Sequence, residues 1–287
     1  MSYPVVFKEA LSDDVFRMRV KAPKIAEKHR PGQFVVLRIN ETGERIPLTI
    51  ADSDPEEGLI TMIFQAVGKT TMLLSDQNVG DSLMDVCGPL GTPTHIENWG
   101  IAACVGGGIG VAPMYPIAKG VKKAGNRLIN ILGSRTKDLL ILEKDMDEFA
   151  DRQLVCTDDG SYGIHGLVTD VLRDIIESDD KPAMVFAIGP LPMMKFVSKL
   201  TKEYEIPTMV SLNSIMVDGT GMCGGCRVTV GGEQKFTCVD GPEFDGHKVD
   251  FDQLGKRLAF YREQEGEARE EYKKHRHECS CGGQGND

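Results

Sequence analysis

The sequence predicts two successive domains of different class, an antiparallel β-barrel followed by an α/β domain built on a parallel sheet. Short β-rich segments fill the first hundred residues, strands alternate with helices after Trp99, and Asp, Pro and Gly clusters separate the elements. A barrel is an economical way to bury many short strands, whereas strand–helix alternation implies right-handed crossovers between parallel strands. A cysteine-rich segment and a polar helix follow these two domains.

The bulk composition limits the kinds of partner. The chain has 287 residues, 41% of them apolar and 26% charged, which is ordinary for a globular protein with two cored domains. A formal net charge of -10 disfavours nucleic acid, because its phosphates would be repelled. The sequence shows neither an apolar run long enough to span a bilayer nor an N-terminal secretion pattern. We therefore expect no membrane insertion and a cytoplasmic protein.

The first domain is expected over residues 1–98. Its predicted strands are β-rich runs bounded by turn residues, and they cover 3–11, 15–22, 33–39, 45–51 and 59–67. Residues 70–76, with the sequence TTMLLSD, carry a helical pattern.

Two stretches of this first domain could meet a phosphate-bearing ligand. Arg45 begins a strand that continues with Pro47 and Thr49, and the sequence Gly68, Lys69, Thr70, Thr71 opens the predicted helix. Basic and hydroxyl groups beside exposed N–H donors suit phosphate. Taken alone, Arg45 is better explained as a solvated surface charge and Thr70 as a plain N-cap. Their position ahead of a dinucleotide domain favours the binding interpretation.

The second domain is expected over residues 99–212. Its predicted strands cover 101–107, 127–134, 153–160 and 183–189, and its predicted helices cover 112–125, 166–178 and 192–204. A parallel sheet of this kind places its ligand crevice at the carboxyl ends of the strands. The cysteine segment is then expected over 213–250, and a polar helix over 251–277 lies within a C-terminal region, 251–287, whose end is Gly-rich.

A glycine cluster, CVGGGIGVAP, stands between a buried strand and a helix. Gly106, Gly107, Gly108, Ile109, Gly110 and Pro113 are the candidate residues. Glycines there let the backbone approach a pyrophosphate, and the helix N-terminus offers it unpaired N–H groups. The cluster departs from the G-x-G-x-x-G fingerprint, so a tight turn made for packing is the competing interpretation.

Further loops follow later strands of the same sheet and converge on the same crevice, which favours a dinucleotide over packing. Their candidate residues are Asp158, Asp159 and Gly160 of the TDDGSYG loop, and Gly189, Pro190 and Met193 of the IGPLPMM loop. Ser134 and Arg135 stand where a 2′-phosphate of NADP would be met, whereas the acidic TDDG loop favours NAD, so the sequence leaves this choice open.

Cysteines concentrate in a Gly-rich segment that reads D-x4-C-x2-C-x11-C, from Asp218 through Cys223 and Cys226 to Cys238. Plant-type 2Fe-2S proteins use C-x4-C-x2-C and a distant Cys, so Asp218 occupies the first ligand position. A carboxylate oxygen suits ferric iron, but three thiolates and a carboxylate also suit zinc.

The remaining cysteines look structural. Cys87, Cys104 and Cys156 each stand among apolar residues and are expected to be buried and inert. The tail HRHECSC carries His275, His277, Cys279 and Cys281, whose short spacings favour a frayed terminus over a chelate.

The barrel motif R-x-P-x-T, followed by GGGIGVAP and GPLPMM, resembles the ferredoxin-NADP reductase superfamily over residues 3 to 210. With the cysteine segment, the chain is similar to the electron-transfer subunits related to dihydroorotate dehydrogenase. Among these it most resembles the small subunits of NADH-dependent reduced ferredoxin:NADP oxidoreductase, because their first ligand position is aspartate where the dihydroorotate relatives have cysteine.

This resemblance implies FAD in the barrel, NAD(P)H in the α/β domain and a 2Fe-2S cluster in the cysteine segment. The implied FAD-binding residues are Arg45, Pro47, Leu48, Thr49, Ile50, Phe64, Gln65, Gly68, Lys69, Thr70 and Thr71. The implied NAD(P)-binding residues are the candidates of the glycine cluster and of the later loops. Asp218 and the three cysteines that follow it are the implied cluster ligands.

The implied function is electron transfer. Hydride passes between NAD(H) and FAD, and single electrons pass through the cluster to or from a larger flavin and iron-sulfur subunit, which contacts ferredoxin and NADP(H). No side-chain acid or base is required. The alternatives are an electron-transfer subunit of dihydroorotate dehydrogenase or sulfide dehydrogenase, and a zinc-stabilised binding module without redox activity.

Overall fold

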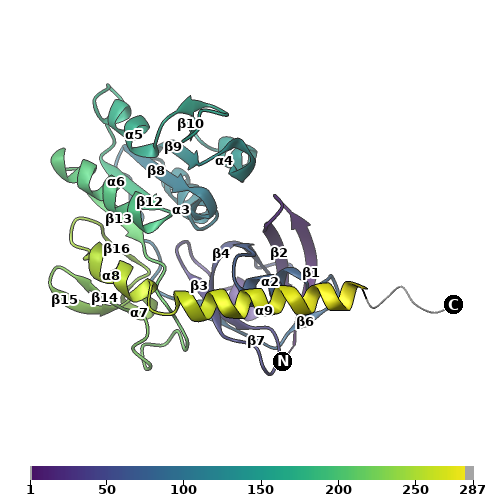
Figure 1. Cartoon of the computed structure of the whole chain (residues 1–287). Helices are drawn as coiled ribbons and strands as arrows, with labels where there is room; N and C mark the ends of the chain where they lie inside the picture. The colour runs from purple at the N-terminus through teal and green to yellow at the C-terminus, as the bar shows by residue number, and fades with distance from the viewer. Residues whose placement is uncertain (1, 282–287) are drawn as a thin grey trace.

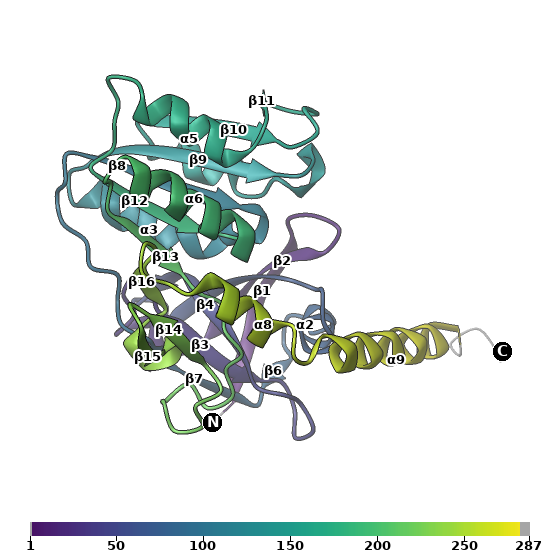
Figure 2. The ribbon, with the colours of Figure 1, turned by 60° about the vertical axis from the view of Figure 1, so that its left-hand side comes forward.

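The protein contains two seven-stranded sheets and a C-terminal segment that contacts both (Figures 1 and 2). The computed structural model describes residues 2–281, and the side chains of residues 2–274. Within these residues no helix is long and apolar enough to cross a membrane.

The first sheet is antiparallel and curls into the expected barrel-like domain. Its strand order is β6-β1-β2-β5-β4-β3-β7. The strands are β1 (Tyr3–Ala10), β2 (Val15–Lys21), β3 (Phe34–Arg38), β4 (Ile46–Asp54), β5 (Leu59–Gln65), β6 (Ser82–Leu83) and β7 (Asp85–Leu90). The five predicted strands are confirmed, as is helix α2 (Lys69–Ser75), whereas β6, β7 and the short α1 (Pro23–Ala26) were not expected.

Alternation along the strands builds the barrel core. In the β2–β5 pair Met18 lies opposite Met62 and Val20 opposite Ile60, and all four side chains are fully buried. Because successive side chains of a strand point to opposite faces, every second residue of these strands turns inward. The core also takes Val35, Leu37, Ile50 and Leu74 from the neighbouring elements.

The second sheet is parallel except at one edge. Its order is β11-β10-β9-β8-β12-β13-β16, and only β16 runs antiparallel to its neighbour. The strands are β8 (Ile101–Gly107), β9 (Arg127–Ser134), β10 (Arg152–Thr157), β11 (Ile164–His165), β12 (Met184–Ile188), β13 (Thr208–Ser211) and β16 (Glu243–Asp245). β16 belongs to the cysteine-rich segment, so that segment is joined to the sheet of the second domain.

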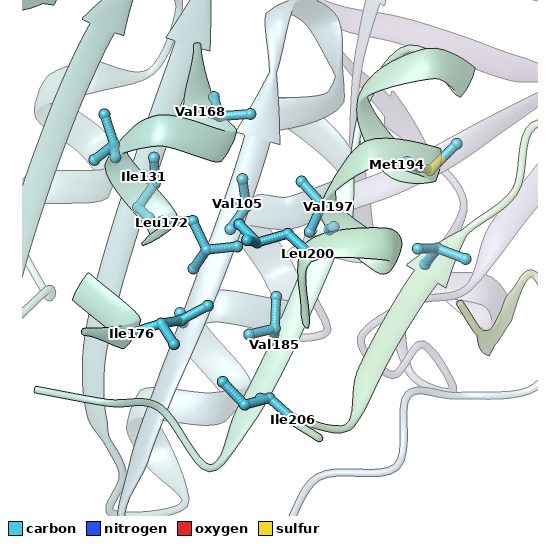
Figure 3. Packing of buried hydrophobic residues seen from close by; sticks show 14 of the residues in the cluster. Val105, Ile131, Val168, Leu172, Ile176, Val185, Met194, Val197, Leu200 and Ile206 are labelled. Atoms are coloured by element: carbon cyan, nitrogen blue, oxygen red, sulfur yellow. The ribbon is translucent and has the colours of Figure 1, made fainter. Parts of the chain in front are cut away.

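Helices cover both faces of this sheet, as strand–helix alternation predicts. One face packs against α5 (Val168–Ile176), α6 (Leu191–Glu203) and α8 (Phe251–Leu258). Figure 3 shows this core, in which Leu172 and Ile176 meet Val105 and Val185 of the central strands. The other face packs against α3 (Val111–Lys123) and α4 (Glu143–Asp147) and reaches the barrel.

The C-terminal region differs from the single helix expected over 251–277. α8 is followed by a separate helix, α9 (Arg262–Cys281), which contacts α2 and in Figure 2 projects away from the barrel. Phe251 and Leu254 bury the apolar face of α8, whereas α9 has no comparable apolar stripe. The chain therefore changes direction between the helices, where Phe260 and Tyr261 are exposed. The cysteine segment adds the hairpin β14 (Arg227–Val230) and β15 (Glu233–Phe236), and α7 (Thr237–Asp240).

Candidate functional site

One large cavity lies between the barrel, the second sheet and the C-terminal segment. Its volume is about 2040 Å³, roughly twice the upper end of the range for a single small-molecule site. It therefore has room for two dinucleotides. The predicted site residues that line it are Arg45, Pro47, Leu48, Thr49, Phe64, Gln65, Gly68, Lys69, Thr70, Thr71, Gly107, Gly108, Ile109, Gly110, Pro113, Ser134, Arg135, Asp158, Gly189, Pro190 and Met193.

Four predicted binding residues do not line this cavity. Ile50 is fully buried in the barrel core, because it points away from the face that carries Thr49. Gly106 is covered by Val111 and Met114 of α3. Asp159 accepts hydrogen bonds from the N–H and hydroxyl of Ser161, within the exposed turn that also holds Gly160.

The loops after β8 and β12 meet where the strand order of the second sheet reverses. β8 pairs with β12, and Ile188 at the end of β12 lies opposite Gly106 at the end of β8. A Cβ atom on Gly110 would lie 2.3 Å from the carbonyl oxygen of Ile188 and 2.6 Å from Cα of Gly189. Only glycine permits this approach, so the loops after β8 and β12 form one wall at the topological switch point.

The barrel contributes polar groups at the start of α2. The N–H of Gly68, the N-cap, donates to Thr71 Oγ1 at 3.0 Å. Thr70 is not the N-cap, because it lies inside the helix and donates to Glu44 Oε2 at 2.8 Å. Arg45 is exposed at the cavity wall with one guanidinium nitrogen 3.8 Å from Asp85 Oδ2. Arg45 and Lys69 therefore place two cations beside this part of the cavity.

The hydroxyl group of Ser134, the last residue of β9, is bonded to the backbone of the loop that follows. Ser134 Oγ donates to the carbonyl oxygen of Thr136 at 2.6 Å. The N–H of Asp158 donates to the carbonyl oxygen of Ser134 at 3.0 Å, which ties the loops after β9 and β10 together. The Arg135 side chain remains exposed at the cavity rim.

The proposed cluster ligands come from one loop and the start of α7. The two carboxylate oxygens of Asp218 accept the N–H groups of Thr220 at 2.9 Å and Cys223 at 2.8 Å. These bonds lower the pKa of Asp218, so its carboxylate is ionised at neutral pH. Cys226 and Cys238 are buried with their sulfur atoms 3.2 Å apart, and Cys223 is exposed.

This donor set suits an iron-sulfur cluster in its chemistry. Each carboxylate oxygen of Asp218 keeps a lone pair beyond its N–H bond, and thiolates are the usual cluster ligands. Burial and the neighbouring Cys226 thiol raise the pKa of Cys238 to about 12. Among the described side chains, no three His, Cys, Asp or Glu residues already form a metal site. Ligation by all four would require the donors to lie closer together than they do in this structure.

The cysteines lie beside the cavity. Cys226 and Cys238 form a small apolar cluster with Met216, Phe34 and Val36. Phe34 and Met216 also line the cavity, so single side chains separate it from the buried cysteines. A Cβ on Gly219, whose φ is +73°, would meet Leu90 at 2.7 Å and Val36 at 2.9 Å, so the loop packs tightly on the barrel.

The single cysteines divide into two classes. Cys104 and Cys156 are buried as expected, and burial raises the pKa of Cys156 to about 11. The expectation for Cys87 was wrong, because this side chain is exposed. It follows the buried Val86 on β7 and therefore points to the opposite face of the strand. The side chains of His275, His277, Cys279 and Cys281 lie outside the described residues.

Sequence reasoning missed the contribution of the C-terminal region to the cavity. Tyr261, Arg262 and Arg269 line it, and α9 lies beside α2. Tyr272 of α9 donates its hydroxyl to Asp76 Oδ2, just past the end of α2, at 2.7 Å. A polar helix gives no sequence signal of its docking site. The one available signal was the aromatic pair Phe260 and Tyr261 within a polar stretch, which indicates a contact surface.

Three family models match the chain in succession. They are the oxidoreductase FAD-binding domain over residues 2–95, the oxidoreductase NAD-binding domain over 104–199, and the iron-sulfur cluster binding domain of dihydroorotate dehydrogenase B over 213–250. A Thermotoga maritima protein, the dihydroorotate dehydrogenase B (NAD(+)) electron transfer subunit homolog, is 54% identical over 91% of this chain and 92% of its own length. The chain belongs to the dihydroorotate dehydrogenase B electron-transfer subunit family.

Other relatives agree with this assignment. The dihydroorotate dehydrogenase B (NAD(+)) electron transfer subunit of Geobacillus thermodenitrificans is 34% identical over 85% of this chain and 96% of its own length. A chain of the solved NADH-dependent reduced ferredoxin-NADP oxidoreductase, studied for flavin-based electron bifurcation, is 51% identical. It superimposes with a TM-score of 0.89 over 94% of this chain and 97% of its own. The ferredoxin reductase of carbazole 1,9a-dioxygenase shares the fold, with a TM-score of 0.60 at 20% identity.

This electron-transfer subunit therefore carries an FAD-binding domain, an NAD-binding domain and an iron-sulfur cluster binding domain in one chain. The predicted ferredoxin reductase-like fold and the predicted oxidoreductase class are confirmed.

Proposed function

We propose that this subunit exchanges hydride between NAD(H) and FAD and passes single electrons through a 2Fe-2S cluster to or from a larger partner subunit. The observation that carries the proposal is the shared wall of the cavity. Phe34 and Met216 line the cavity that both dinucleotide domains enclose, and they also pack against Cys226 and Cys238. A cofactor in the cavity and a cluster on these cysteines would be separated by little more than one layer of side chains.

The barrel side of the cavity suits FAD. Arg45 and Lys69 supply positive charge for its pyrophosphate, and Pro47, Leu48 and Thr49 of β4 give a flat, partly apolar strand for the ring system. Bound FAD accepts a hydride as an electron pair and releases the electrons singly. The chain itself supplies position and charge.

The sheet side suits the nicotinamide nucleotide. Gly107 to Gly110 open α3 and expose backbone to a pyrophosphate at the switch point, while Gly189 to Met193 face it from the loop after β12. The acidic Asp158 at the cavity rim favours NAD(H) over NADP(H), whereas Arg135 nearby carries the opposite preference. We propose NAD(H), because the Ser134 hydroxyl already donates to the Thr136 carbonyl oxygen and is not free to bind a 2′-phosphate.

The cluster ligands in this proposal are Asp218, Cys223, Cys226 and Cys238. Aspartate in the first position favours the bifurcating oxidoreductase type over the dihydroorotate type. The larger partner would then carry further flavin and iron-sulfur groups and contact ferredoxin and NADP(H), in a cytoplasmic complex. The alternative is an electron-transfer subunit for dihydroorotate dehydrogenase, favoured by the naming of the 54% identical relative.

The test is anaerobic purification of the native complex, followed by identification of its subunits and analysis of FAD, iron and zinc. We expect about two irons per chain in the 2Fe-2S site of this subunit, beside bound FAD and a larger flavin and iron-sulfur subunit. A colourless, iron-free and zinc-loaded chain would contradict electron transfer. A dihydroorotate-oxidising flavoprotein as the partner would retain electron transfer and overturn the bifurcating assignment.

A further inference from the structure

Helix α8 lies next to the cysteine loop and is firmly anchored. Residues 251–258 lie outside the three matched family regions, which end at residue 250. Phe251 and Leu254 are buried in the core of the second domain, and Asp250 caps the helix by accepting the N–H of Gln253 at 2.9 Å. Lys195 of α6 pairs with Asp252 at 2.6 Å. These contacts fix the helix axis, so its last turn has a defined position.

The last turn of α8 carries Arg257 to the cysteine loop. Its guanidinium Nη2 donates to the carbonyl oxygen of Gly225 at 3.0 Å, and the side chain is partly buried. Gly225 lies between Cys223 and Cys226, inside the C-x2-C motif. Burying part of a charged guanidinium costs desolvation free energy, and the hydrogen bond to the Gly225 carbonyl group offsets this cost. Arg257 therefore has a defined bonding partner in the cysteine loop.

Gly225 is held from both sides. Its N–H donates to Cys223 Sγ at 3.4 Å, while its carbonyl group accepts from Arg257. Fixing the carbonyl restricts rotation of the residue and keeps the N–H directed at the sulfur. N–H groups directed at cluster sulfurs, and positive charge nearby, both favour the reduced form of an iron-sulfur centre.

We propose that Arg257 is a positioning residue that holds Gly225 against Cys223 and raises the reduction potential of the cluster. The inference rests on the proposed cluster site. Other charges near the cysteines include Arg227, which directly follows Cys226 and approaches Gly224, the Asp218 carboxylate, and Asp240 on α7. Arg257 differs from Arg227 in binding the backbone of the motif, so its effect includes geometry as well as charge.

The test compares Arg257→Gln, Arg257→Lys and Lys256→Gln in the full-length protein with its cluster. Lys256→Gln removes the same charge from the neighbouring position of α8 without the bond to Gly225. Midpoint potential and g values are measured by EPR-monitored redox titration, and the thermal midpoint of each variant checks folding. We expect the potential to fall in the order wild type, Arg257→Lys, Arg257→Gln, with a smaller shift for Lys256→Gln.

An unchanged potential and unchanged g values in Arg257→Gln would overturn the proposal, as would an equal shift in Lys256→Gln. If Arg257→Gln does not fold, Arg257→Lys decides. A single ammonium donor holds the carbonyl less rigidly than the guanidinium fork, so a potential identical to wild type would then overturn it. Absence of any iron-sulfur signal in the wild-type protein would instead refute the proposed cluster itself.

Discussion

In the proposed function, Asp218 is the residue that distinguishes the bifurcating type of subunit from the dihydroorotate type. Its carboxylate braces the cysteine loop through Thr220 and Cys223, and it occupies the first position of the cluster motif. To hold the loop in place, a side chain need only accept the two N–H groups of Thr220 and Cys223. Ligation requires an anionic oxygen, so the two roles separate under substitution.

We predict that Asp218→Cys retains a cluster whose EPR g values differ from wild type, because a softer thiolate replaces a carboxylate oxygen at one iron. Asp218→Asn keeps one acceptor oxygen without the anion and is expected to lose most of its iron. EPR of the reduced proteins and iron analysis measure both effects. An identical spectrum for wild type and Asp218→Cys would show that Asp218 is not a ligand.

Glu243 gives the fold a pH-dependent contact between its two halves. It lies on β16 of the second sheet and accepts the hydroxyl of Thr94, in the segment that follows the barrel, at 2.7 Å. Burial raises the pKa of Glu243 to about 7. The folded protein therefore holds a proton that the unfolded chain releases near pH 4.5, so this group makes stability fall as pH rises between these values.

We predict that titration of Glu243 lowers the free energy of unfolding by about 2.5 kcal/mol between pH 5 and pH 8. Glu243→Gln keeps the size of the side chain and an acceptor for Thr94, but the amide does not titrate. The thermal midpoint of this variant should therefore fall less between pH 5 and pH 8 than the thermal midpoint of wild type. The thermal midpoints of both proteins at the two pH values measure this. Equal losses would contradict the assigned pKa.

Among the elements, helix α9 was the least expected part of the site, because it is polar and yet lines the large cavity beside α2. Its docking uses Tyr272 and Asp76, together with cavity contacts from Arg262 and Arg269. The first turns of α9 therefore form part of the cavity wall next to α2.

We predict that a chain ending at Ala259 binds FAD about tenfold more weakly than the full-length chain, because it loses the part of the cavity wall formed by Tyr261, Arg262 and Arg269. Tyr272→Phe removes one hydrogen bond and should weaken binding by only a few-fold. Fluorescence titration of released flavin measures both. Equal affinity of the truncated and full-length proteins would show that α9 does not contribute to the FAD site.

The close approach of the loops after β8 and β12 gives a second prediction at the level of elements. Gly110→Ala would place a methyl group 2.3 Å from the Ile188 carbonyl oxygen, so the loops after β8 and β12 must separate. We expect NADH affinity to fall by about tenfold or more, with the flavin site unchanged. Isothermal titration with NADH measures this, and wild-type affinity in the variant would contradict the loop geometry.

The sequence predicted most of the molecule where local signals are strong. The barrel strands carry β-branched runs, and the second sheet alternates strands with amphipathic helices, so both halves were foreseeable. β7 was not, because Gly88 and Pro89 at its end read as a turn. The β14–β15 hairpin was missed despite Gly231 and Gly232, a recognised two-residue turn.

The unpredicted parts of the site depend on contacts between distant segments. β16 has three residues and joins the second sheet only through long-range pairing with β13. Similarly, no local pattern indicates that Arg257 meets Gly225, or that Phe34 and Met216 join the cavity to the cysteines. Most of the predicted binding residues line the cavity because loops after parallel strands must converge. Ile50, Gly106, Asp159 and Gly160 do not, because neighbours of a ligand-binding residue often face elsewhere.

In the proposed function, one chain converts the electron pair of NADH into single electrons. Anaerobic stopped-flow mixing of the purified subunit with NADH, followed by freeze-quench EPR, tests this step. We predict bleaching of flavin absorbance first, then an S = 1/2 iron-sulfur signal that rises in the same chain without any partner. Flavin reduction with no later cluster signal would contradict the path through Cys226 and Cys238, and failure of NADH to bleach the flavin would contradict the account as a whole.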